Sequence, residues 1–179
     1  MKQILSRYTK EQVKKASLIK AIFFDVDGVL TDGKIIYDNE GNETKQFNVK
    51  DGYIISHLKK AGIVVGIITG RDSKVVSFRA NELKLDFCHQ GIVDKLSVLE
   101  KLVDFHKLKK KQVAYIGDDI NDLGALKNCG LSVCPADAMS YLKSKVDLVT
   151  QVKGGEGVVR EVADLVLSAR GEMEKILKI

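Results

Sequence analysis

Short apolar runs alternate with amphipathic stretches along most of the chain, and this alternation constrains the fold more than any other feature. Five β-prone runs have the length of buried strands, and a sixth is short enough to lie at a sheet edge: 21–24, 64–68, 87–89, 113–116, 131–133 and 148–149. The other stretches have the spacing of helices, at 52–61, 73–83, 95–106, 121–128, 139–143 and 157–169. Because strands that alternate with helices form a parallel sheet covered by helices, the sequence predicts an α/β fold.

Length and charge narrow the class of protein. With 179 residues, 45% of them hydrophobic, residues 1–179 are expected to form one domain. No stretch approaches the ~18 uncharged apolar residues of a membrane span, and the charged first 20 residues lack the apolar segment of a secretory signal. We therefore expect a cytoplasmic protein with no membrane attachment. The net charge of +5 is spread along the chain, so no nucleic-acid partner is expected.

One segment departs from the alternation. Residues 33–51 contain two β-prone runs around Asn39-Glu40-Gly41-Asn42 instead of an amphipathic helix. This pattern is typical of a β-hairpin. We expect a small flap at about residues 33–49, beside the carboxyl edge of the sheet, where open α/β sheets bind ligands.

Two carboxylates, Asp25 and Asp27, follow the first predicted strand. Carboxylates this close repel each other unless a cation or a shared proton compensates them. One can attack phosphorus as a covalent nucleophile, and the other can act as general acid and base. An ordinary Asp-Gly turn would also use these residues, so the motif alone leaves both interpretations open.

Two later motifs carry weaker signals. Thr69-Gly70-Arg71 follows the second predicted strand, where a hydroxyl and helix N-terminal amides can bind a phosphoryl oxygen or where a cap can start the next helix. Lys95 begins a predicted helix, where a cation is unfavourable for the helix dipole and hints at a nearby anion. A solvated lysine would also account for it.

The segment Gly117-Asp118-Asp119-Ile120-Asn121-Asp122 concentrates three carboxylates directly after a predicted buried strand. One of them would cap the next helix. Hard oxygen ligands at a strand end suit Mg²⁺, which is typically held by one or two carboxylates, waters and a substrate phosphate. The sequence therefore favours a magnesium site here.

In their order, the motifs DVDG, TGR, VDK and GDDINDL resemble the haloacid dehalogenase superfamily. The resemblance implies a Rossmann-like three-layer α/β sandwich and phosphoryl transfer through an aspartyl-phosphate. It implies that Asp25 is the nucleophile and that Asp27 is the general acid and base. Thr69 and Lys95 would hold the phosphoryl oxygens.

The same resemblance implies a metal site. Mg²⁺ would be bound by the Asp25 carboxylate, the Asp27 backbone carbonyl and Asp118. Asp119 and Asp122 match the remaining acidic positions of the last motif and would contact the metal ligands instead of the metal itself.

A closer resemblance covers nearly the whole chain. The stretches DVDGVLTDG, ETKQFNVKDG, QGIVDK and KGGEGVVRE are similar to the 3-deoxy-D-manno-octulosonate (KDO) 8-phosphate phosphatase family. This implies hydrolysis of that sugar-acid phosphate in lipopolysaccharide synthesis, a small flap with no large cap domain, and a homotetramer whose subunits help to close one another's sites. The substrate-binding positions implied are Asp27, Thr31, Lys45, Gly70, Arg71 and Arg79.

Arg71 bears on the choice of substrate. A related phosphatase of a nine-carbon keto-deoxy sugar acid has an acidic residue at the corresponding position. Arg71 is a planar donor suited to a carboxylate such as that of the substrate, and it favours the eight-carbon acid. The nine-carbon acid phosphate, or another sugar phosphate, is the main alternative.

Two alternatives belong to other classes. A phosphoryl-accepting receiver domain also combines acidic residues, a hydroxyl and a lysine, but its acceptor aspartate and acidic pair follow another order along the chain. A non-catalytic regulatory module of the same fold would be expected to lack a catalytic residue, and none of the motif positions is substituted here.

Overall fold

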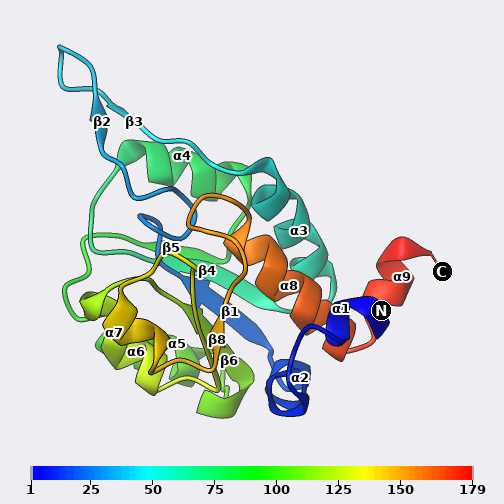
Figure 1. Ribbon diagram of the computed structural model, residues 1–179. Helices are drawn as coiled ribbons and strands as arrows, with labels where there is room; N and C mark the ends of the chain where they lie inside the picture. Colours follow the sequence, from blue (N-terminus) through cyan, green and yellow to red (C-terminus); the bar gives the residue numbers. More distant parts are fainter. Residues whose placement is uncertain (1, 179) are drawn as a thin grey trace.

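A six-stranded parallel sheet between two layers of helices forms the centre of the computed structural model, which describes residues 2–178 (Figure 1). The strand order is β5-β4-β1-β6-β7-β8. The strands are β1 (Ala21–Phe24), β4 (Val64–Ile68), β5 (Phe87–His89), β6 (Val113–Ile116), β7 (Leu131–Cys134) and β8 (Leu148–Val149). The predicted α/β fold is confirmed. The central strand β1 pairs with β4 on one side and β6 on the other, so the chain order switches at β1, and ligands bind at such switch points.

Helices cover both faces of the sheet, because strands buried on both sides leave no face to water. One face packs on α2 (Lys10–Ser17), α3 (Val49–Lys60), α4 (Lys74–Glu82) and α8 (Val158–Ala169). The other face packs on α5 (Lys95–Phe105), α6 (Leu123–Lys127) and α7 (Ser140–Lys143). All four residues of β1 are fully buried. The loop after β1, which carries Asp25 and Asp27, therefore begins from a strand that is buried on both faces.

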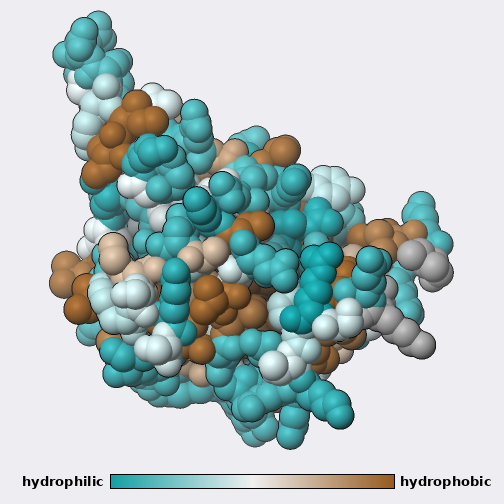
Figure 2. Space-filling model, viewed as in Figure 1, coloured by the Kyte–Doolittle hydropathy of each residue, from teal (hydrophilic) through white to brown (hydrophobic). Residues whose placement is uncertain are grey.

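The predicted flap is a short antiparallel hairpin, β2 (Ile36–Tyr37) with β3 (Glu43–Thr44). Asp38 closes its turn by accepting bonds from Glu40 N, Asn42 N and Asn42 Nδ2. The hairpin projects beyond the carboxyl edge of the sheet (Figure 1). Its strands are mostly exposed, and Figure 2 shows a hydrophobic area where the flap meets the rest of the molecule.

Several boundaries differ from the prediction. Helix α3 begins at Val49, three residues early, because Asn48 caps it by accepting from Lys50 N; the flap therefore ends before residue 49. Strand β5, predicted to be buried, is an edge strand and half-buried. Three further helices, α1 (Lys2–Leu5), α2 and α9 (Met173–Leu177), were not predicted. None of the helices within residues 2–178 has the length and apolarity needed to cross a bilayer.

Candidate active site

The carboxylate of Asp25 lies at the end of β1 and is only 5% exposed. Its Oδ1 accepts a hydrogen bond from Val26 N at 2.7 Å, and its Oδ2 accepts one from Lys95 Nζ at 2.6 Å. Burial, followed by the charge of Asp122, raises the pKa of Asp25 above its ordinary value, and Lys95 opposes that rise. The carboxylate is therefore held in place, with its charge only partly compensated.

Lys95 provides that compensation from the first residue of α5. Its side chain is fully buried, with Nζ 2.6 Å from Asp25 Oδ2 and 2.7 Å from Asp122 Oδ1. Burial alone would lower the pKa of Lys95, but the charges of Asp25 and Asp122 raise it overall. The sequence analysis inferred an anion near Lys95 from the position of this lysine at the start of a helix, and the two carboxylates agree with that inference.

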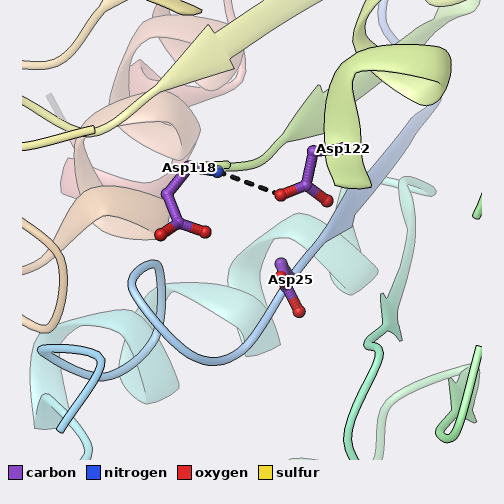
Figure 3. Close-up of side chains that lie close together, drawn as sticks. All are labelled: Asp25, Asp118 and Asp122. Carbon is purple, nitrogen blue, oxygen red and sulfur yellow. Dashed lines mark hydrogen bonds between the residues drawn. The ribbon is translucent and has the colours of Figure 1, made fainter. Parts of the chain in front are cut away.

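Asp118 and Asp122 extend from the loop after β6 toward Asp25 (Figure 3). Asp122 is fully buried and accepts from Lys95, from the Tyr115 hydroxyl at 2.7 Å and from Asp118 N at 3.1 Å. Burial, then the charges of Asp122 and Asp25, raises the pKa of Asp118 to about 7. Unlike the carboxylates of Asp25 and Asp122, that of Asp118 accepts no hydrogen bond from the described residues.

The three carboxylates form a group that a divalent cation would fit. Carboxylate oxygens of Asp25, Asp118 and Asp122 lie within 4.8 Å of one another, and the buried Lys95 pairs with two of them, Asp25 and Asp122. Asp122 already accepts several hydrogen bonds, so Asp25 and Asp118 are the carboxylates best placed to bind an ion. Oxygen donors of this kind suit Mg²⁺.

Gly28 allows Asp118 to approach the loop that carries Asp25 and Asp27. Its φ is +83°, and a Cβ there would lie 2.1 Å from Asp118 Oδ2. A side chain at residue 28 would therefore push away one of the two best-placed metal ligands and strain the backbone.

A cavity of about 230 Å³ opens above these carboxylates. The residues that line it are Asp25, Asp27, Gly33, Thr69, Gly70, Arg71, Asp118, Asp119 and Asn121. The sequence analysis did not identify Asn121 as a site residue. Its position in the last acidic motif, between Asp119 and Asp122, could have indicated that it lies at the site. The structure thus brings motifs from three strand ends to one opening.

The remaining predicted residues lie around this cavity or away from it. Thr31 is buried, and its Oγ1 lies 3.4 Å from Asp27 Oδ1. Lys45 is buried and contacts Asp27 at 2.5 Å. Arg79 is outside the cavity lining, where it stacks on Phe47 and pairs with Glu82. None of Thr31, Lys45 and Arg79 is among the residues that line the cavity.

The Gly-rich segment before α8 packs directly on the catalytic loop. Gly155 N donates to Val29 O at 3.0 Å. A Cβ on Gly154 would lie 2.2 Å from Gly28 O. Only glycine permits this backbone contact, which braces the loop that carries Asp25 and Asp27.

A buried carboxylate that the sequence did not indicate, Asp51, holds the start of α8. Helix α8 begins after Gly157, which has no side chain to cap it. Asp51 is 2% exposed and accepts from Arg160 N at 2.7 Å, while its Oδ2 has no hydrogen-bond partner among the described residues. Burial raises the pKa of Asp51 to about 6.

Comparisons with known proteins agree with this geometry. The family model of the haloacid dehalogenase-like hydrolases matches residues 78–162. The chain is 45% identical to 3-deoxy-D-manno-octulosonate 8-phosphate phosphatase KdsC of Yersinia pestis over 162 residues, 90% of this chain and 87% of that relative.

Two solved structures are also similar. One is the phosphatase of the same name from Moraxella catarrhalis in complex with magnesium, phosphate and KDO, with a TM-score of 0.93 and 40% identity over 96% of this chain and 98% of that one. The other is the cobalt-bound phosphatase of Haemophilus influenzae, with a TM-score of 0.84 and 41% identity over 88% and 92% of the two chains.

Proposed function

The chain belongs to the haloacid dehalogenase-like hydrolases and, within them, to the 3-deoxy-D-manno-octulosonate 8-phosphate phosphatases, and on this premise we propose how its residues act. It is a Mg²⁺-dependent phosphomonoesterase that converts KDO 8-phosphate to KDO and phosphate, a step of lipopolysaccharide synthesis. The observation that carries the assignment is the position of Asp25, fixed by Lys95 at 2.6 Å on the floor of the cavity beside Asp27 and Asp118.

In the first step, Asp25 attacks phosphorus and the bond from phosphorus to the sugar oxygen breaks. Asp27 donates its proton to that leaving oxygen, so the sugar departs as a neutral alcohol. Thr69, in the cavity lining, holds the transferred group, and Lys95, which is bonded to Asp25, offsets the negative charge. Phosphoryl transfer depends mainly on such positioning and charge neutralisation.

In the second step, Asp27 takes a proton from water as the water attacks the aspartyl-phosphate. Phosphate leaves, and Asp25 returns as a carboxylate. Asp25, Asp118 and the Asp27 carbonyl would hold Mg²⁺. The bound ion supplies positive charge that lets an anionic nucleophile approach an anionic phosphate.

Substrate choice is assigned to Arg71 at the mouth of the cavity. Its side chain is 38% exposed, and its Nε has no hydrogen-bond partner among the described residues. A guanidinium with spare donors can bind the carboxylate of a sugar acid. Gly70 lies beside it in the cavity lining. A nine-carbon keto-deoxy acid phosphate has the same carboxylate and stays the alternative substrate.

We further propose that residues 1–179 act as one domain in a cytoplasmic homotetramer. The flap exposes apolar side chains, Ile35 at 52% and Ile36 at 43%, and a short hairpin alone covers the cavity poorly. A neighbouring subunit would shield both.

The assignment is tested by phosphate release with Mg²⁺ and with chelator across keto-deoxy sugar-acid phosphates of eight and nine carbons and their decarboxylated analogues. We expect Mg²⁺-dependent release with the highest kcat/KM on the eight-carbon acid phosphate. A preference for the nine-carbon acid would change the substrate but keep the chemistry. No release from any compound would support the regulatory module.

A further inference from the structure

The flap meets the cavity through four charged side chains that form a closed ring. Lys45 Nζ lies 2.5 Å from Asp27 Oδ1, and Asp27 Oδ2 lies 3.5 Å from Arg71 Nε. Arg71 Nη2 lies 3.0 Å from Glu43 Oε1, and that same oxygen lies 3.3 Å from Lys45 Nζ. Cations and anions alternate around this set, which we call the flap ring: Asp27, Glu43, Lys45 and Arg71.

Glu43 is the member of the flap ring with no role in the chemistry so far. A carboxylate in this place cannot attract an anionic substrate, yet its side chain is only 13% exposed. It accepts hydrogen bonds from Arg71 and from the Ser73 hydroxyl. Burial tends to raise the pKa of Glu43, but the bonds from Ser73 and Lys45 lower it overall. Glu43 therefore carries its charge and holds cations.

Lys45 forms ion pairs with two carboxylates and does not line the cavity. Its side chain is 1% exposed, and it is absent from the cavity lining. Its Nζ lies between Asp27 and Glu43. Without Glu43, Lys45 would have Asp27 as its one ion-pair partner in the part of the chain described, and its position would no longer be set from two sides.

Arg71 depends on Glu43 in the same way. Its Nη2 donates to Glu43 Oε1 and to the Tyr37 hydroxyl, both at 3.0 Å and both from the flap. Without the Glu43 charge, the flap would contact Arg71 through the neutral Tyr37 hydroxyl and no longer through an ion pair. Both cations that flank Asp27 are thus oriented by one flap carboxylate.

We propose that Glu43 is a positioning residue for Asp27: it fixes Lys45 and Arg71 in the places from which they orient the Asp27 carboxyl. This inference rests on the proposed function, in which Asp27 is the general acid. It follows that the flap must be docked for acid catalysis, because β3 carries Glu43 and is followed directly by Lys45. The exposed hairpin thereby becomes part of the catalytic apparatus.

The test compares Glu43→Gln with the unaltered enzyme on two aryl phosphates that carry no carboxylate. Phenyl phosphate has a poor leaving group and needs the acid, whereas p-nitrophenyl phosphate has a good one and needs it little. We expect kcat/KM to fall about tenfold on phenyl phosphate and about twofold or less on p-nitrophenyl phosphate. Equal losses on both, or no loss on either, would overturn the proposal.

Two controls sharpen this result. Glu40→Gln removes the same charge from an exposed flap position and should leave both substrates unchanged. The losses from Glu43→Gln and Lys45→Met on phenyl phosphate should combine to less than their sum in free energy, because Glu43 acts through Lys45. Full additivity would contradict that route.

Failure of the inference can be told from failure of the proposed function. If the unaltered chain hydrolyses aryl phosphates but not KDO 8-phosphate, the substrate assignment fails and the Glu43 comparison still stands. If it hydrolyses KDO 8-phosphate and Glu43→Gln shows no leaving-group dependence, the inference alone fails.

Discussion

Two sets of alternating charges meet at the cavity, and they differ in what holds them. Lys95 with Asp25 and Asp122 forms a core set, whose side chains are 0–7% exposed and come from strand ends and the first turn of α5. In the flap ring, Asp27 is 20% exposed and Arg71 is 38% exposed. The core set is preorganised by the sheet, whereas the flap ring exists only while the hairpin is docked. The proposed nucleophile Asp25 is thus held by the core of the fold, and the proposed general acid Asp27 is held partly by an exposed hairpin.

The largest expected effect comes from breaking the core set at the nucleophile. Asp25→Asn should lower phosphate release by about 10⁴-fold or more, because no other residue can form the aspartyl-phosphate. The fold should persist, since the change alters little volume. Circular dichroism and a urea unfolding curve would check this. A variant that keeps most of its activity would contradict the covalent mechanism.

The next effect compares the two buried lysines. Lys95→Met should destabilise the metal-free protein by about 3–5 kcal/mol, because it leaves two buried carboxylates without their cation. Lys45→Met should cost about 1 kcal/mol, because its partners reach water. Urea unfolding in the presence of chelator measures both. Lys101→Met, an exposed position on the same helix as Lys95, is the matched control.

Equal losses for Lys45→Met and Lys95→Met would remove the distinction between the core set and the flap ring. If Lys101→Met lowers the free energy of unfolding as much as Lys95→Met does, the effect comes from changing helix α5 and not from the buried ion pairs.

The last prediction uses Asp51, which is buried like the core set but has no ion-pair partner among the described residues. Its pKa of about 6 lies above the usual 3.8, so between about pH 4 and 6 the folded protein keeps a proton that the unfolded chain releases. This part of the stability is present at low pH and is lost as pH rises through 6, by up to about 3 kcal/mol at about 1.4 kcal/mol per pKa unit.

Asp51→Asn removes that dependence. Its free energy of unfolding, relative to the unaltered protein, should therefore increase from pH 4 to pH 7, as measured by urea titrations at each pH. Asp104→Asn, at an exposed position, serves as the control. If the stability of Asp51→Asn relative to the unaltered protein does not change with pH, the pKa of Asp51 is not raised in the folded protein.

The sequence predicted the parts of the site that the sheet determines. Parallel strands end at one edge, so residues that directly follow β1, β4 and β6 converge without any further information. For this reason Asp25, Thr69 and Asp118 could be placed near one another from motif order alone. The fold class followed from the same alternation of strands and helices.

The tertiary structure decided the contacts that lack such a pattern. Glu43 and Tyr37 reach Arg71 across 28 and 34 residues, and Asp51 reaches the start of α8 across 109 residues. No periodicity links these positions, so their meeting depends on where the hairpin and helices pack. Arg79 shows the converse: its helix was predicted, but its guanidinium lies over the Phe47 ring and it is not among the residues that line the cavity.

Strand ends are thus fixed by local pattern and topology together, and the sequence by itself placed Asp25 and the acidic loop of residues 117–122 at one edge of the sheet. The ion pairs around Asp27, the cap of α8 and the division of charges between core and flap came from packing. Such contacts depend on the summed burial of many side chains, which local sequence does not encode.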